Sequence, residues 1–279
     1  MREIETDLIR RTIKDLFLQA NFVLGSDVIR AFEKGKAAEE SPLGKDIFSR
    51  LLENAALAKE HYIPMCQDTG LAVVFVELGQ DVHITGGNLV EALEEGVRQA
   101  YQEGYLRKSV CHPLTRENTG DNTPPIIHID VVPGDQLKLV AMPKGGGSEN
   151  MSRLYMLPPS AGWSGVKERI IQTVEKAGPN PCPPLIVGVA LGGSFELAAR
   201  EAKKTLLRPI GQSNPDPQAA ALEEELLEAI NDTGIGPEGL GGRITALAVH
   251  LKLIPCHIAS LPLAVNLQCH ASRHVEAVL

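Results

Sequence analysis

The chain has 279 residues with an apolar content of 43% and an aromatic content of 4%, which is enough for one large domain or two modest ones. Its formal charge of −8 is spread over short clusters, which argues against the basic face that a nucleic-acid-binding protein needs. No apolar run approaches a membrane span, and the polar, acidic N-terminus is unlike a signal peptide, so we expect a cytoplasmic protein with neither nucleic acid nor membrane as a partner.

The first sixty residues have helical periodicity. Apolar side chains repeat at helical spacing over residues 4–21, and Ser26 and Asp27 offer the start of a second helix that ends near Gly35. A third helix opens at Pro42 and continues to about residue 61. We therefore expect an N-terminal helical part over residues 1–62.

The next stretch predicts strands separated by a helix and a long polar connection. Residues 71–78 are apolar on both faces, which is typical of a central strand, and residues 88–104 return to helical spacing. Residues 105–125 are polar and rich in turn formers, and a connection of this length in a compact domain is usually functional or disordered. Residues 126–132 and 136–142, joined by Pro-Gly-Asp, predict a β-hairpin.

The second half continues as an α/β chain. An apolar strand ends in two glycines, and Ser194 follows them as a possible cap for the next helix. The other expected elements are helices over 164–176, 195–207 and 218–230 and strands over 185–193 and 243–253. Because no repeat, low-complexity tract or linker interrupts the chain, we expect one mixed α/β domain over residues 1–279, with sheet-borne active-site loops and with residues 1–62 as its helical part.

Residues 143–150 form a glycine-rich segment directly after a predicted strand. Its three consecutive glycines allow close approach of the backbone and can turn N–H groups toward an anion. The spacing matches neither a Walker A loop nor a dinucleotide fingerprint. A plain flexible linker is the alternative, but Lys144, Ser148, Glu149 and Asn150 favour an anion-binding role.

Five widely separated cysteines form a poor disulfide framework. They lie at positions 66, 111, 182, 256 and 269. Their separation argues against a C-x-x-C zinc ribbon but suits an iron–sulfur cluster whose ligands meet in the folded state. Three thiolates on a four-iron cluster would leave one iron open as a Lewis acid. Local position alone does not choose three ligands among the five.

Four motifs in order along the chain point to a family. They are Cys66-Gln-Asp-Thr-Gly70, Lys144-Gly-Gly-Gly-Ser-Glu-Asn150, the run from Cys182 to Gly193, and the run from His257 to Cys269. With these motifs the whole sequence resembles the α subunit of the two-subunit, iron–sulfur (class I) fumarate hydratases, a family that also includes L(+)-tartrate dehydratase.

The resemblance implies roles for particular residues. Ligands of an oxygen-sensitive [4Fe-4S] cluster would be Cys66, Cys182 and Cys269, which leaves Cys111 and Cys256 as non-ligands. Catalytic residues would be Asp68 and His257, and substrate-binding residues would be Gln67, Arg107 and Gly146. Such types suit a small dicarboxylate substrate, because cationic and amide groups bind carboxylates and a base takes the proton from carbon.

The resemblance also implies that this chain is half of an active site. The family's remaining catalytic segment does not follow Cys269, so we expect a separate β subunit, an α2β2-type assembly and no activity in the isolated chain. The expected reaction is hydration of fumarate to L-malate. Alternatives are an L(+)-tartrate dehydratase α subunit, a non-enzymatic metal-stapled scaffold, and a phosphate-binding module built on the glycine-rich loops.

Overall fold

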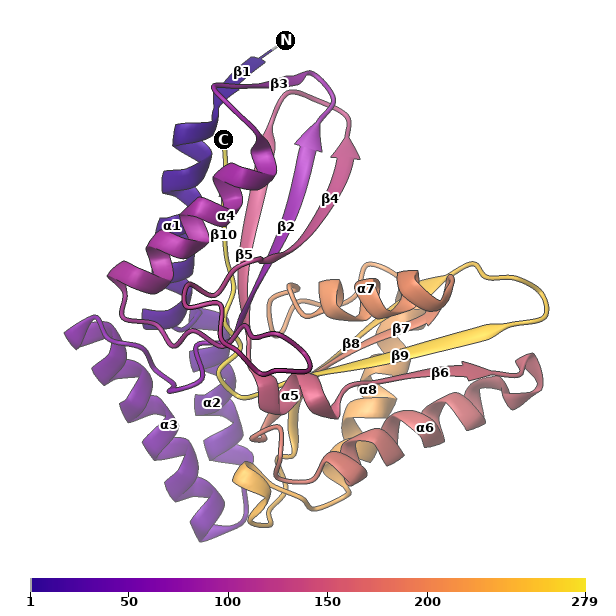
Figure 1. The fold of residues 1–279 in the computed structure, drawn as a ribbon. Helices are drawn as coiled ribbons and strands as arrows, with labels where there is room; N and C mark the ends of the chain where they lie inside the picture. Colours follow the sequence, from indigo (N-terminus) through magenta and orange to yellow (C-terminus); the bar gives the residue numbers. More distant parts are fainter. Residues whose placement is uncertain (1) are drawn as a thin grey trace. The chain divides into compact units, whose positions relative to one another are not determined.

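The computed structural model describes residues 2–279, which pack as two compact units with separate apolar cores. The first unit contains the chain up to Leu24, Asn54–Gly146 and Arg273–Leu279, and the second contains Gly25–Glu53 and Gly147–Ser272. Each unit combines helices with a mixed sheet, so the predicted mixed α/β class is confirmed (Figure 1). The single domain expected over residues 1–279 stays a prediction.

The first unit is built on a four-stranded sheet in the order β10-β5-β2-β4. Its strands are β2 (Leu71–Gly79), β4 (Ile126–Val132), β5 (Leu137–Lys144) and β10 (Val275–Val278). The apolar strand β2 is central, as predicted, and pairs parallel with β4 and antiparallel with β5. The predicted hairpin of residues 126–132 and 136–142 is therefore wrong, because β2 lies between the two strands.

The reason lies in the Pro-Gly-Asp turn, which spans the end of β2 instead of closing a hairpin. The main-chain N–H groups of Gly79 and Asp81 donate to carbonyls of Gln136 and Gly134 at 2.9 and 3.0 Å. A Cβ at Gly79 would lie 2.5 Å from the Gly134 oxygen, so only glycine allows this crossing. A strand that is buried on both faces gains two neighbours in this way.

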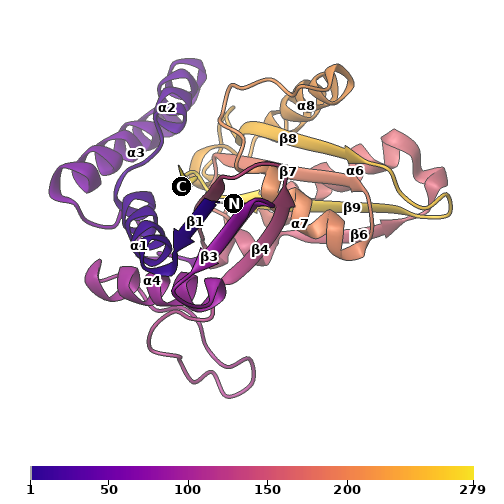
Figure 2. The ribbon, with the colours of Figure 1, turned by 90° about the horizontal axis from the view of Figure 1, so that it is seen from above.

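Two helices complete the core of the first unit. They are α1 (Thr6–Phe22) and α4 (Leu89–Glu103), and their apolar faces pack with the sheet in one cluster (Figure 1). At Gly96 the helices approach closely, since a Cβ there would lie 2.1 Å from a methyl of Ile13. A short parallel pair, β1 (Arg2–Glu5) with β3 (Val82–Thr85), was not predicted from the sequence (Figure 2).

The second unit has a four-stranded sheet in the order β6-β9-β7-β8, which can be followed in Figure 2. Its strands are β6 (Arg153–Leu157), β7 (Leu185–Gly192), β8 (Ala246–Ile254) and β9 (Leu261–Gln268). Helix α5 (Gly146–Met151) begins within the glycine-rich segment, and it is followed by α6 (Gly162–Ala177), α7 (Phe195–Thr205) and α8 (Pro217–Asn231). Side chains of α6 and α8 pack on one face of the sheet, and alanines of α7 pack with β7 and β9 in a separate cluster.

Several local expectations are corrected in this unit. Ser194 precedes α7, but its hydroxyl donates to the Glu196 carboxylate at 2.8 Å and does not cap a helix N–H. The glycine-rich segment contains the one-and-a-half-turn helix α5, and strands β6 and β9 were not predicted from the sequence.

The predicted N-terminal helices are confirmed, and they divide between the units. Helix α1 belongs to the first unit and α2 (Ser26–Ala38) to the second. Helix α3 (Pro42–His61) is divided: its residues up to Glu53 belong to the second unit and those from Asn54 to the first. Among the helices of residues 2–279, none combines the length and apolar composition that a membrane span requires.

Candidate active-site residues

The motif that begins at Cys66 forms the connection between α3 and β2. Cys66 and Asp68 are half-buried there, and Gln67 is exposed. The amide oxygen of Gln67 accepts from the Cys66 thiol at 3.2 Å and from the Asp68 N–H at 2.5 Å. Because its oxygen is engaged by neighbours, the NH2 group of Gln67 is the part of that side chain that can donate to a ligand.

The carboxylate of Asp68 is fixed by backbone donors. Its Oδ1 accepts from the Gly70 N–H at 3.0 Å, and its Oδ2 accepts from the Gly146 N–H at 2.7 Å. The glycine-rich segment thus does turn an N–H group toward an anion, and that anion is the chain's own Asp68. Each carboxylate oxygen has two lone pairs, so a proton or a ligand can still be accepted.

Close backbone contact makes this arrangement possible. Gly70 has φ of +80°, and a Cβ there would lie 2.7 Å from the Lys144 nitrogen. Glycine is therefore required at this point. The N–H of Gly146 is engaged by Asp68, and its role in substrate binding stays a prediction.

Polar side chains donate hydrogen bonds to main-chain carbonyls of the Cys66 loop. These side chains were not predicted from the sequence as part of the site. The Arg273 guanidinium donates to the Asp68 carbonyl at 2.9 Å and to Oδ1 of Asn21 at 3.2 Å, and it is 2% exposed. The Asn21 carbonyl accepts from the Met65 N–H at 3.1 Å, while Nδ2 of Asn54 donates to the Met65 carbonyl at 2.8 Å. An asparagine within the apolar stripe of a helix was the available signal for Asn21.

Tyr101 supports the same loop from α4. Its hydroxyl lies 2.9 and 2.8 Å from the carbonyls of Thr69 and Gly70. Burial raises the pKa of Tyr101 above its usual range, so the hydroxyl keeps its proton as a donor.

Arg107 lies beside this loop, at the start of the long polar connection. Its carbonyl accepts from the Thr69 hydroxyl at 3.1 Å, while its side chain is exposed and has no ion-pair partner among residues 2–279. This state suits a residue that pairs with a substrate carboxylate. That role stays a prediction.

The long connection is ordered by its own polar side chains. Asn122 is fully buried, accepts from the Ser109 N–H at 2.6 Å and donates to the Gly70 carbonyl at 3.2 Å. Burial alone would raise the pKa of Asp121, but hydrogen bonds from Thr123 and Arg98 lower it to about 2. The Asn122 bond joins this segment to the Cys66 loop at Gly70, and the Arg98 bond joins it to α4.

Two of the predicted ligands, Cys182 and Cys269, lie at the same end of the sheet in the second unit. Cys182 precedes β7 and Cys269 follows β9, and the antiparallel register pairs Ile186 with Gln268. Both cysteines therefore lie at the same end of the two central strands, where the His270 N–H donates to the Cys182 carbonyl at 3.2 Å. Cys182 is exposed and has φ of +54°, and Cys269 is half-buried.

His257 lies elsewhere in the second unit. It sits in the exposed turn between β8 and β9, where Nδ1 accepts from the Ala259 N–H at 3.1 Å. The eight residues of β9 separate this turn from Cys269. At 3.3 Å per residue that strand is about 26 Å long. The structure of this unit thus does not bring His257 to Cys182 and Cys269, and its catalytic role stays a prediction.

The remaining two cysteines, Cys111 and Cys256, make local contacts within their own loops. Cys111 belongs to an isolated bridge with Asn118, and the Cys256 thiol lies 3.2 Å from the Ser260 carbonyl. Within residues 2–279 no group of three or more His, Cys, Asp or Glu side chains is arranged to hold a metal ion.

Comparison with known proteins gives a family. The family model described as fumarate hydratase (Fumerase) matches residues 10–278. A protein of Methanocaldococcus jannaschii named "Putative L(+)-tartrate dehydratase subunit alpha" is 43% identical over 271 residues, which cover 95% of each chain. The L(+)-tartrate dehydratase subunit alpha of Escherichia coli strain UTI89 is 36% identical over 88% of this chain and 82% of its own length, and that of strain K12 is 35% identical over the same shares.

Proposed function

The chain belongs to the fumarate hydratase family, and from this premise we propose that it is the α subunit of a cytoplasmic iron–sulfur hydro-lyase that hydrates fumarate to L-malate reversibly. The observation that carries the proposal is the Asp68 carboxylate, held between two backbone N–H groups beside Cys66 and Gln67. A catalytic carboxylate needs such fixed geometry, because proton transfer is efficient only over a defined short distance.

The cofactor proposed is a [4Fe-4S] cluster with Cys66, Cys182 and Cys269 as its ligands. Two observations support it: Cys182 and Cys269 lie at the same end of strands β7 and β9, and the half-buried Cys66 thiol lies in a loop beside the amide of Gln67. Thiolates are the usual ligands of such clusters. When bound, the cluster supplies a Lewis acid for the substrate hydroxyl.

The chain's own residues would bind and orient the substrate and move its proton. The exposed guanidinium of Arg107 pairs with one carboxylate of the substrate, and the NH2 group of Gln67 donates to an oxygen of the same molecule. Asp68 exchanges the proton at the carbon next to the one that carries the hydroxyl. In dehydration that carbon loses its proton, the neighbouring carbon loses its hydroxyl, and the products are fumarate and water.

A second candidate substrate is L(+)-tartrate. The names of the relatives from Methanocaldococcus jannaschii and Escherichia coli favour it, whereas the description of the family favours fumarate. Tartrate and malate differ by one hydroxyl, so a few side chains decide between them. Those relatives are named as α subunits, which supports a separate β subunit and an α2β2-type assembly here.

The test is anaerobic purification of the chain with its β subunit, followed by rates on L-malate and L(+)-tartrate side by side. We expect about four irons and four sulfides per chain, with loss of both in Cys66→Ser, Cys182→Ser and Cys269→Ser but not in Cys111→Ser. The isolated chain should be inactive. Zinc in place of iron, or full activity without the β subunit, would refute the proposal.

A further inference from the structure

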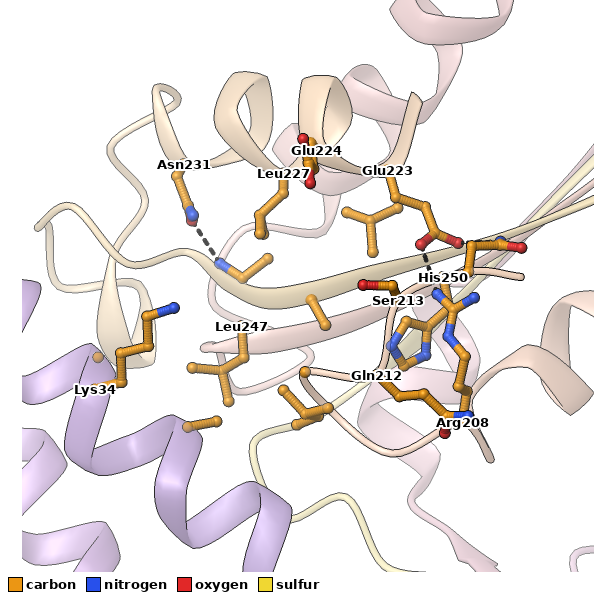
Figure 3. Close-up of a pocket in the computed structure, with 18 of the residues that line it drawn as sticks. Lys34, Arg208, Gln212, Ser213, Glu223, Glu224, Leu227, Asn231, Leu247 and His250 are labelled. Carbon is orange, nitrogen blue, oxygen red and sulfur yellow. Dashed lines mark hydrogen bonds and ion pairs between the residues drawn. The ribbon is translucent and has the colours of Figure 1, made fainter. Parts of the chain in front are cut away.

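The second unit contains a cavity of about 560 Å³, a size typical of small-molecule sites (Figure 3). Its walls come from α2, α8, the segment 208–214 and strand β8. None of Cys182, Cys269 and His257 lines it. The lining thus contains none of the residues assigned above to the hydro-lyase reaction.

The cavity follows the free edge of β8. The consecutive residues Ala246, Leu247, Ala248, Val249 and His250 all line it, although successive side chains of a strand point to opposite faces. One cavity can reach all five only along the edge of the strand. That edge is unpaired in the sheet, because β8 is the last strand in the order.

Side chains occupy the edge on both sides of the cavity. At the start of β8, Oδ1 of Asn231 accepts from two successive N–H groups at 2.8 Å. Further along, Glu223 accepts from the Leu251 N–H at 2.6 Å and Asn214 donates to the Leu251 carbonyl at 2.7 Å. Alternation along the ladder turns the main-chain groups of Val249 to the same side as those of Leu251. Only a short stretch of edge is open, which suits a small ligand better than an added strand.

The charges around the cavity favour an anion. Arg30 and Lys34 lie one helical turn apart on α2, are exposed, and have no ion-pair partner among residues 2–279; Figure 3 shows Lys34 extending from α2 toward β8. Arg208 pairs with Glu223 at 2.7 Å, and its buried Nε has no hydrogen-bond acceptor in the part of the chain that is described. Glu224 is the other carboxylate in the lining.

The remaining lining is largely apolar. In Figure 3 the side chains of Leu227 and Leu247 lie on opposite sides of the β8 ribbon, Leu227 toward α8 and Leu247 toward α2. The lining also contains Ile210, Ile244 and several alanines. A ligand that satisfies both parts of the wall has an anionic head near α2 and an apolar body over β8 and α8.

We propose that this cavity binds a small anion with an apolar body, of the class of medium-chain carboxylates. The site is independent of the proposed reaction, since it contains none of the residues assigned to it. It gives the chain a place where such a molecule binds without competing for the substrate residues.

The test is isothermal titration of the full chain with octanoate, using acetate and octanol as probes that lack the apolar body and the charge. We expect one octanoate site per chain and much weaker binding of both other probes. The double variant Arg30→Glu, Lys34→Glu should weaken octanoate binding about tenfold or more, which corresponds to about 1.4 kcal/mol. Lys36→Glu, on the same helix but outside the lining, is the matched control and should leave the affinity unchanged.

A second variant tests the volume instead of the charge. Ala31→Phe places a ring in the cavity from α2 and should abolish octanoate binding while the far-UV circular dichroism spectrum stays unchanged. Equal affinity in the double charge variant and the wild type, or no binding of millimolar octanoate, would overturn the proposal. Loss of binding when the β subunit is added would also overturn it, because the cavity would then be part of a subunit interface.

Discussion

Replacing Arg273 by Met removes the guanidinium that donates to the main chain of the Cys66 loop. The buried side chain donates to the Asp68 carbonyl and to Asn21. A hydrogen bond that involves a charged group contributes about 1.5–3 kcal/mol, and both acceptors would be left without this donor. Methionine fills part of the volume and requires no desolvation of a charge, which offsets part of the loss. We therefore expect the free energy of unfolding to fall by about 2–4 kcal/mol.

Urea denaturation of the full chain measures this change. Arg273→Lys keeps the charge, but a single ammonium lacks the planar fork that reaches both acceptors, so we expect an intermediate loss of about 1–2 kcal/mol. Arg50→Met is the control, because Arg50 is 73% exposed and its partner Asp46 lies on the same helix. That control should change the free energy of unfolding by less than about 0.5 kcal/mol.

Hydrogen exchange locates the effect. The N–H groups of Met65 and Gly146 donate to Asn21 and Asp68, so both should exchange faster in Arg273→Met than in the Arg50→Met control. A free energy of unfolding within 0.5 kcal/mol of the wild type, or unchanged exchange at both amides, would show that Arg273 does not hold the loop.

Three further predictions concern single carboxylates. Glu39 is 1% exposed and accepts from four backbone N–H groups, those of Arg243 and Ile244 among them. Burial alone would raise the pKa of Glu39, but these bonds lower it. In urea denaturation Glu39→Gln should lower the free energy of unfolding by about 2–4 kcal/mol, because one N–H group would face the new NH2 group. Asp68→Asn should lower kcat of the assembled complex on malate by about 100-fold or more while the iron content is retained, and an unchanged kcat would exclude Asp68 from proton transfer. In the folded chain the pKa of Asp121 is about 2, below its unfolded value. Its contribution to the free energy of unfolding, about 1–2 kcal/mol, is therefore present above about pH 4 and disappears as the pH falls toward 2. The difference in the free energy of unfolding between the wild type and Asp121→Asn should shrink over that range.

Periodic elements could be predicted from the sequence because their signals are local. The three N-terminal helices, β2 and the helices α4, α6, α7 and α8 each carry an apolar pattern within one segment, and their boundaries agree with the expectation to within a few residues. Helix α5 was not predicted. Short strands such as β1, β3 and β6 lack this information. Four or five residues give too few repeats of the pattern, and pairing with a distant strand decides their conformation.

The hairpin prediction was wrong for the same reason, because pairing with a distant strand decided the structure. Two apolar runs joined by Pro-Gly-Asp match the local signal of a hairpin, and nothing in those residues indicates that β2 will lie between them. The deciding information is at Gly79, where the missing side chain lets the turn cross the strand end. A glycine at the end of an apolar strand is compatible with many structures, so this choice depends on packing that only the fold supplies.

In the candidate site, too, the local part could be predicted from the sequence and the long-range contacts could not. Cys66, Gln67, Asp68 and Gly70 are close in sequence, so a motif could identify them, whereas two of the groups that fix Asp68 come from Gly146 and Arg273, 78 and 205 residues away. Hydrogen bonds of this range leave no periodic trace, and a buried arginine near the C-terminus has the same sequence signature as an exposed one. Chemistry could therefore be read from the sequence, but the orientation that makes a carboxylate an effective base depends on donors that the fold brings to it.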